Sequence, residues 1–302
     1  MKIVFMGTPD FAVPCLDALI KAGHEILCVV TQPDKPQGRK QILTAPPVKE
    51  LALQNGLAVF QPEKMKTDET YEELKQYDAD FFVVVAYGKI LPKRILDLPK
   101  YACINVHGSL LLKYRGAAPI QWAVINGETE TGVTTMLMNE GLDTGDMLMT
   151  LKTPIEKSET AGELFDRLAK LSPALLLETL EKYASGEIKP IPQNHDEATF
   201  APPLSKDMAV LDWSLSSETL YNHIRGLNPW PVAIGDINGN KLKIFSSELI
   251  DITSEKPFGT AYAEDGKIAV VCGDAKVLYL TEIQFPGSKR MKTVDFLRGR
   301  SI

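Results

Sequence analysis

The sequence has only four cysteines, no long apolar run and no histidine cluster with metal-ligand spacing. Its cysteines stand singly, each in or beside an apolar run, which favours buried free thiols over disulfides or a metal site. No apolar stretch approaches the roughly 20 residues that a membrane-spanning helix needs. The N-terminus is typical of a first strand and not of a signal peptide, so we expect a cytoplasmic protein.

Several nucleotide and hydrolase motifs are also missing. The first predicted strand–helix turn, Gly7-Thr8-Pro9-Asp10-Phe11, has one glycine and lacks the G-x-G-x-x-G that brings pyrophosphate to a helix N-terminus. The chain contains no Walker loop and no G-x-S-x-G nucleophile elbow. These absences disfavour a dinucleotide-binding domain, a P-loop enzyme and an α/β-hydrolase.

The charge of the chain is unevenly distributed. The net charge of −6 lies within residues 1–204, because residues 205–302 contain 12 basic and 12 acidic residues. Two stretches oppose the acidic trend, one from Lys35 to Lys49 and one from Lys289 to the end. Local basic patches on an acidic protein can hold a polyanion, although each is equally compatible with a solvated surface.

The first half of the chain alternates strand and helix patterns. The runs KIVFMG, ILCVVT, FFVVVAYG and ACINVHG predict strands buried on both faces, with helices between them at Phe11–Lys21 and Pro47–Gln54. This alternation predicts an α/β fold with a Rossmann-like, doubly wound and mostly parallel sheet. A longer helix is predicted over Thr160–Ser185, kinked or split at Pro173 and ended by Gly186.

The second half has a different composition. The proline-rich and polar segment KPIPQNHDEATFAPP predicts a linker or a strap across a surface. One helix is predicted over Ser216–Arg225, followed by GLNPWP and by short β runs that predict a small barrel or sandwich. We therefore divide the chain into a catalytic domain (1–189), a linker (190–207) and a β-rich C-terminal domain (208–302).

Two polar residues, Asn105 and His107, lie at the C-terminal end of the predicted strand that ends in Asn105-Val106-His107. Asn105 and His107 alternate with Val106 and so leave the same face, at the carboxyl end of a strand where α/β proteins bind ligands. Asp143 and Asp146 follow in a glycine-punctuated loop. A histidine acid or base, an amide donor for an oxyanion and an orienting carboxylate suit acyl transfer between nitrogens. The alternatives are side chains bonded to loop backbone and an ordinary Asx turn.

Four motifs in order carry a family resemblance. MGTPDFAVP, AYGKILP, NVHGSLLLKYRGAAPIQWAVINGE and GLDTGDML closely resemble the 10-formyltetrahydrofolate-dependent formyltransferases, and within them the branch that acts on methionyl-tRNA. The resemblance covers essentially the whole chain, including TFAPPLSK, LNPWP and VDFLRGR. It implies a one-carbon transferase that moves a formyl group from 10-formyltetrahydrofolate, a cosubstrate, to the α-amino group of initiator methionyl-tRNA. No tightly bound cofactor, metal or membrane is implied, and we expect a monomer whose C-terminal domain is an OB-like barrel that binds tRNA.

The resemblance also assigns residues. It implies that Asn105, His107 and Asp143 are catalytic. Folate would be lined by Ser109, Leu110, Leu111 and Leu112 together with the backbone around Tyr87, Gly88, Ile90 and Leu91. The tRNA acceptor end would be contacted by Lys35, Arg39 and Lys40.

One departure and three alternatives accompany this assignment. The family reads S-L-L-P where this chain has Ser109-Leu110-Leu111-Leu112, so the folate-lining turn lacks a proline. A sugar-nucleotide N-formyltransferase would share the catalytic trio, but the basic stretch and the β-rich half argue against it. A formylfolate hydrolase or dehydrogenase is disfavoured because no aldehyde dehydrogenase domain follows. An inactive RNA-binding module is disfavoured by the intact trio.

Overall fold

The chain divides into two compact units in a computed structural model that describes residues 1–38 and 41–302. The N-terminal unit comprises Met1–Pro119, Thr131–Thr153 and Phe165–Ala201, and the C-terminal unit comprises Ile120–Glu130, Pro154–Leu164 and Pro202–Ile302. Within the described residues, no helix combines the length and apolar character needed to span a bilayer.

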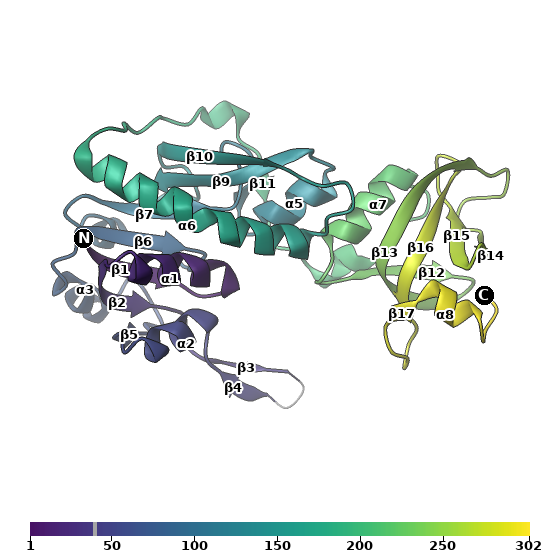
Figure 1. The fold of residues 1–302 in the computed structure, drawn as a ribbon, viewed down its shortest axis with the longest axis horizontal. Coiled ribbons are helices and arrows are strands. Elements are labelled where there is room, and N and C mark those ends of the chain that lie inside the picture. Colours follow the sequence, from purple (N-terminus) through teal and green to yellow (C-terminus); the bar gives the residue numbers. More distant parts are fainter. Residues whose placement is uncertain (39–40) are drawn as a thin grey trace. The chain divides into compact units, whose positions relative to one another are not determined.

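The N-terminal unit is built around a seven-stranded sheet of order β10-β9-β7-β6-β1-β2-β5 (Figure 1). Its strands are β1 (Lys2–Gly7), β2 (Glu25–Val30), β5 (Val59–Phe60), β6 (Phe81–Val85), β7 (Ala102–His107), β9 (Glu130–Leu137) and β10 (Met147–Pro154). The pairs among β5, β2, β1, β6 and β7 are parallel, whereas β7 pairs with β9 antiparallel. The predicted α/β fold with a mostly parallel sheet is confirmed.

The unit contains further helices and short strands outside this sheet. They are η1 (Asp10–Ala12), α1 (Val13–Lys21), the hairpin β3 (Lys35–Gln37) and β4 (Ile42–Thr44), α2 (Pro47–Gln54), α3 (Asp68–Lys75), α4 (Lys93–Leu96), β8 (Arg115–Gly116), α6 (Ala161–Ser185), η2 (His195–Glu197) and β11 (Phe200–Ala201). Alternate β1 residues serve opposite faces: Val4 and Met6 pack in a core cluster with Leu74 of α3 and Ile95 of α4.

Helix α6 lies along the other face of the sheet (Figure 1). Its Phe165 ring is 5.3 Å from that of Phe11, and its Tyr183 ring is 6.3 Å from that of Phe81 in β6. A capping box opens the helix, because the Glu163 carboxylate accepts from the Thr160 backbone N–H while the Thr160 hydroxyl accepts from the Glu163 N–H. The predicted split at Pro173 does not occur: the 25-residue helix is continuous through it.

The C-terminal unit contains an antiparallel sheet of order β12-β13-β16-β15-β14, with β17 beside β16. Its elements are α5 (Pro119–Ile125), η3 (Lys206–Ala209), α7 (Ser217–Gly226), β12 (Ala233–Ile237), β13 (Asn240–Thr253), β14 (Ala261–Glu264), β15 (Lys267–Val271), β16 (Lys276–Gln284), β17 (Met291–Lys292) and α8 (Thr293–Leu297). Leu220 and Ile224 of α7 and Phe296 of α8 pack with the sheet in one core. The sheet confirms a β-rich half, whereas its closure into an OB-like barrel stays a prediction.

Candidate functional site

The predicted strand end places Asn105 and His107 side by side within the sheet. Strand β7 runs between β6 and β9, where Asn105 pairs in register with Val84 and Met136 and His107 pairs with Thr134. Only 9% of Asn105 and 6% of His107 is exposed. Burial at this depth is costly for polar side chains unless they bind a partner, in the protein or in a ligand.

The imidazole of His107 has one fixed nitrogen and one available nitrogen. Its Nε2 lies 2.9 Å from the carbonyl oxygen of Tyr114. A carbonyl can only accept, so Nε2 carries a proton and donates it. The other nitrogen, Nδ1, lies 3.7 Å from Oδ2 of Asp143. Nδ1, the atom that faces the carboxylate, is therefore the ring nitrogen that remains available to a ligand.

Asp143 is held in a tightly specified loop between β9 and β10. Its Oδ2 accepts a hydrogen bond of 2.8 Å from the backbone N–H of Gly116, and its φ of 51° is left-handed. Two residues later, a Cβ on Gly145 would lie 1.6 Å from the carbonyl oxygen of Leu137, so only glycine fits there. The loop therefore presents the Asp143 carboxylate in one defined position. Asp146, from the same glycine-rich motif, is part-buried, and its carbonyl accepts from the N–H of Leu137.

Asn105 differs from His107 in having no internal partner. Among the described residues, none forms a hydrogen bond with the Asn105 side-chain amide. The alternative of a loop-satisfied pair thus applies to His107, which bonds Tyr114, and not to Asn105. A nearly buried amide without a protein partner is available to donate to a ligand oxygen.

The segment Ser109–Leu112 forms a buried turn beside this strand end. The Ser109 hydroxyl donates to the Lys113 carbonyl at 2.7 Å, so it shapes the turn. Thr134 of β9 braces the same turn, donating to the Ser109 carbonyl at 2.7 Å and accepting from the Leu111 N–H at 3.3 Å. Leu111 is buried, Leu110 and Leu112 are part-buried, and the Leu111–Leu112 peptide bond is cis. Folate contact by these four residues stays a prediction.

The second predicted folate segment follows β6. The side chains of Tyr87 and Leu91 belong to the core cluster beneath α3 and α4, whereas Ile90 is 67% exposed. The Tyr87 carbonyl accepts from Thr8 Oγ1 at 3.1 Å and from Gln32 Nε2 at 2.9 Å. Gly88 has a φ of 77°, and a Cβ there would lie 2.6 Å from Gln32 Nε2. The Tyr87 side chain thus packs in the core and its carbonyl already accepts two hydrogen bonds, so folate contact by this segment stays a prediction.

The predicted tRNA-contacting residues fall on the β3–β4 hairpin. Lys35 is exposed, and its Nζ donates to Gln32 Oε1 at 2.8 Å. Arg39 and Lys40 lie outside the described residues. Lys49, part of the same basic stretch, forms an ion pair with Asp34 at 2.8 Å, so the Asp34 carboxylate balances its positive charge.

The sequence reasoning missed two groups of supporting residues. Thr8, Gln32 and Thr134 brace the two predicted folate segments, and Arg115 and Gln193 form a buried pair at 2.6 Å. Arg115 lies within the motif KYRGAAP and could have been singled out there. Gln193 carries no local signal, because it stands in a polar segment that predicts a linker.

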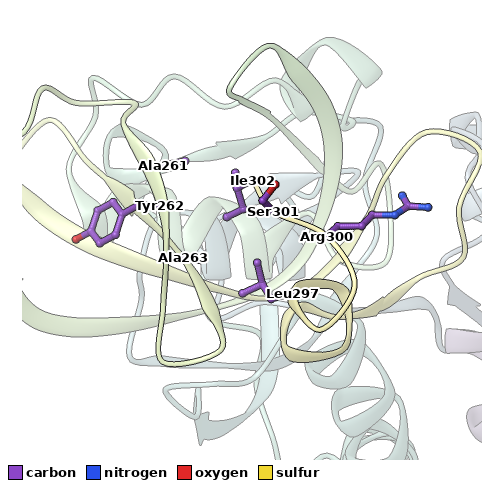
Figure 2. A pocket seen from close by; sticks show the side chains of 7 residues that line it. All are labelled: Ala261, Tyr262, Ala263, Leu297, Arg300, Ser301 and Ile302. Atoms are coloured by element: carbon purple, nitrogen blue, oxygen red, sulfur yellow. The ribbon is translucent and has the colours of Figure 1, made fainter.

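A pocket occurs in the C-terminal unit, lined by Ala261, Tyr262, Ala263, Leu297, Arg300, Ser301 and Ile302 (Figure 2). It contains none of the predicted site residues. Across residues 1–38 and 41–302, no three His, Cys, Asp or Glu side chains converge as metal ligands would.

Comparisons with known proteins identify the family of the chain. Residues 1–180 match the formyl transferase family, and residues 203–301 match the formyl transferase C-terminal domain. The chain is 51% identical to methionyl-tRNA formyltransferase of Clostridium novyi, over 100% of this chain and 98% of that one. It is 48% identical to methionyl-tRNA formyltransferase of Bacillus subtilis, over 100% of this chain and 95% of that one.

Solved structures share the fold at lower identity. WlaRD, a sugar 3N-formyl transferase, matches with a TM-score of 0.71 and 19% identity over 96% of this chain and 99% of that one. HypX from Aquifex aeolicus, solved with tetrahydrofolic acid, matches with a TM-score of 0.66 and 18% identity over 98% of this chain, which spans 47% of HypX. With a family match over most of its length and full-length relatives about half identical, the chain belongs to the formyl transferase family and, within it, to the methionyl-tRNA formyltransferases.

Proposed function

We propose that this chain transfers a formyl group from 10-formyltetrahydrofolate to the α-amino group of methionine on charged initiator tRNA. The observation that carries the proposal is one strand end that holds both the His107–Asp143 pair and the nearly buried Asn105 amide, which bonds none of the described residues. Relatives named for this activity match the entire chain, which favours it over a sugar-nucleotide substrate. Folate serves as a cosubstrate, and the turns at 87–91 and 109–112 are the proposed folate-lining segments.

The three polar side chains divide the chemistry between them. The Asn105 amide donates a hydrogen bond to the oxygen that gains negative charge as the methionine amine attacks the formyl carbon. The amine loses one proton as the new carbon–nitrogen bond forms, and the folate nitrogen gains one as its bond to that carbon breaks. We assign the transfer of this proton between the two nitrogens to His107 Nδ1 and the Asp143 carboxylate, which lie 3.7 Å apart.

The fixed partners of His107 and Asp143 keep the reacting atoms in place. Nε2 remains bonded to the Tyr114 carbonyl, so the imidazole does not rotate when Nδ1 changes its protonation state. Once Nδ1 is protonated, the Asp143 carboxylate stabilises the imidazolium, and the imidazolium itself can support the oxyanion. None of the three side chains is a strong nucleophile, so the proposed reaction proceeds without a covalent enzyme intermediate.

The remaining assignments complete the proposal. Residues 1–189 form the catalytic domain, 190–207 the linker and 208–302 an OB-like domain that binds tRNA, with Lys35, Arg39 and Lys40 contacting the acceptor end. A monomeric enzyme in the cytoplasm stays a prediction.

One incubation tests the proposed function. Pure protein is mixed with 10-formyltetrahydrofolate and methionyl-tRNA, and formylmethionyl-tRNA is measured by acid gel or mass spectrometry. A matched reaction contains an amino sugar nucleotide in place of tRNA. Formylation of the tRNA alone supports the proposal, whereas formylation of the sugar alone, or of neither acceptor, contradicts it.

A further inference from the structure

The segment predicted as a linker begins with a strap, residues 191–201, that packs within the N-terminal unit. At one end, Ile191 and Met147 exchange backbone hydrogen bonds of 2.8 and 2.9 Å. At the other end, β11 pairs with β8 in parallel. Between these anchors Gln193 is 6% exposed, whereas its neighbours Pro192 and Asn194 are exposed. One polar side chain of the strap is thus turned into the protein.

Gln193 clamps the backbone of the Asp143 loop. Its Nε2 donates to the carbonyl oxygens of Asp143 at 3.0 Å and Gly145 at 2.6 Å. Its Oε1 accepts from Nε and Nη2 of Arg115 at 3.1 and 2.6 Å. A guanidinium can only donate and a carbonyl can only accept, so the amide has one allowed orientation. Both amide hydrogens and the carbonyl oxygen are in use.

Arg115 is well placed to support this clamp. It is 3% exposed, and its Nη2 also lies 3.0 Å from Nδ1 of His195 in the strap. The buried guanidinium is therefore surrounded by acceptors from the strap, which fixes its position and, through it, that of the Gln193 amide.

The residues on either side of Arg115 hold the two proposed proton carriers. Tyr114 accepts from His107 Nε2 through its carbonyl, and Gly116 donates its N–H to Asp143 Oδ2. Three consecutive residues thus set the imidazole, the carboxylate and, by way of Gln193, the backbone that carries the carboxylate. Across the site that these contacts surround, His107 Nδ1 lies 3.7 Å from Asp143 Oδ2.

A role limited to attaching the strap does not account for these contacts. The strap is already anchored by Ile191 and by β11. Within the described residues, every hydrogen bond of the Gln193 side chain goes to Arg115 or to the Asp143 loop. We propose that Gln193, held by Arg115, is a positioning residue that fixes Asp143 against His107 for formyl transfer. The inference rests on the proposed function, because only that function gives the pair a reaction.

The test compares Gln193→Glu and Gln193→Met with Asn194→Ala in the full-length protein. Glutamate keeps an acceptor for Arg115 but turns an oxygen toward two carbonyls, and methionine removes both polar ends. Among the described residues, the Asn194 side chain bonds Glu197 and Asp196 of the strap alone, so Asn194→Ala serves as the matched control. We expect both Gln193 variants to lower kcat about tenfold to a hundredfold, the scale of a misplaced catalytic group, with KM for both substrates nearly unchanged. Asn194→Ala should retain kcat.

A double-mutant cycle separates positioning from general destabilisation. If Gln193 acts through Asp143, Gln193→Met should reduce kcat much less in an Asp143→Ala background than in the parent. Multiplicative losses, or an unchanged kcat in both Gln193 variants with parental activity intact, would overturn the inference. Hydrogen exchange of residues 141–147 gives a readout without catalysis: it should accelerate in both Gln193 variants at unchanged Tm, and unaltered exchange overturns the clamp. If the parent fails to formylate tRNA while the Gln193 variants still exchange faster than the parent, the result contradicts the proposed function and leaves the clamp supported.

Discussion

At the scale of single residues, the strand end was predictable because a strand alternates its side chains. Asn105 and His107 could be placed on one face from their spacing alone, and the structure buries both there. The partners that hold them could not be predicted. Gln193 is 50 residues from Asp143 in sequence, and its contacts depend on where the strap crosses the fold. Long-range polar contacts leave no local pattern for a sequence to show.

Alanine at Asn105, His107 or Asp143 should each lower kcat about a hundredfold or more, the scale of losing one preorganised donor or one acid–base group. Because the three act together, a His107→Ala/Asp143→Ala double variant should lose far less than the product of its single losses. Steady-state kinetics on methionyl-tRNA measures both effects. His24→Ala, at a part-buried residue directly before β2, is the matched histidine control. Near-parental turnover in a folded His107→Ala protein would contradict the mechanism.

Gly116→Ala should damage both stability and activity. Gly116 has a φ of 121°, and an added Cβ would lie 2.7 Å from the Ala201 carbonyl oxygen. The strained backbone should cost about 1–3 kcal/mol of unfolding free energy and move the N–H that binds Asp143. Urea unfolding and kcat are the measurements. Gly287→Ala is the control, since its φ of 73° is also positive but nothing lies within 4 Å of an added Cβ. It should lose some stability and keep kcat; equal kcat losses in both variants would contradict the argument.

At the scale of elements, apolar runs predicted the strands and helices correctly, whereas the helix break expected at a proline was wrong. Helix α2 has the predicted bounds, and the four predicted strands correspond to β1, β2, β6 and β7. Pro173 did not divide α6, because a proline removes one N–H while apolar contacts, such as those of Leu164, Leu168 and Leu176, continue on both sides of it. The two-residue strands β8 and β11 form only through each other, so no local pattern predicts them.

The base of the β3–β4 hairpin supplies a pH-dependent contribution to stability. The Gln61 amide and then the Lys49 ammonium, both 2.8 Å from Asp34, hold the pKa of that carboxyl below its ordinary value of 3.8. The folded state therefore binds this proton less readily than the unfolded chain does. The stabilisation is complete above the ordinary pKa and is lost as pH falls through the lowered one.

Asp34→Asn should accordingly destabilise the protein at pH 7, and the difference from the parent should shrink progressively as the pH falls below 3.8. Urea unfolding of variant and parent across this range measures the free-energy difference. Asp251→Asn is the control, because Asp251 pairs with Lys276 at 3.3 Å while 97% exposed, and such pairs contribute little. An Asp34→Asn difference that stays constant with pH would contradict the proposed ionic tie.

At the scale of the whole molecule, composition indicated two units but not how the chain is shared between them. Residues 191–201 pack with the N-terminal unit, whereas Ile120–Glu130 and Pro154–Leu164 belong to the C-terminal one. The chain passes between the units more than once. A composition profile shows only the order of segments along the sequence and not the unit in which each segment packs. Folding also compensates part of the charge of the basic C-terminal stretch, because Arg290 pairs with Glu282 at 2.5 Å and Arg298 with Asp295 at 3.1 Å. Net charge along the sequence therefore overstates the free positive charge of that stretch.

The four cysteines are buried and unpaired, as predicted, and can report the unfolding of each unit. Burial raises the pKa of Cys15 and of Cys272 to about 12, and it also raises the pKa values of Cys28 and Cys103. Thiolate is the reactive form, so the folded protein should resist iodoacetamide at pH 8. Rapid labelling of any cysteine in the absence of denaturant would contradict this expectation.

Increasing urea should expose these cysteines in two stages. Cys272 lies in the C-terminal unit, which is the smaller, and the other three lie in the N-terminal unit. A smaller unit buries a smaller fraction of its surface, so it should unfold at lower denaturant. Pulse labelling with iodoacetamide, followed by peptide mass spectrometry, should therefore detect modified Cys272 at urea concentrations that leave Cys103 protected. Simultaneous labelling of all four would show that the two units unfold as one cooperative body, and the opposite order would show that the N-terminal unit is the less stable of the two.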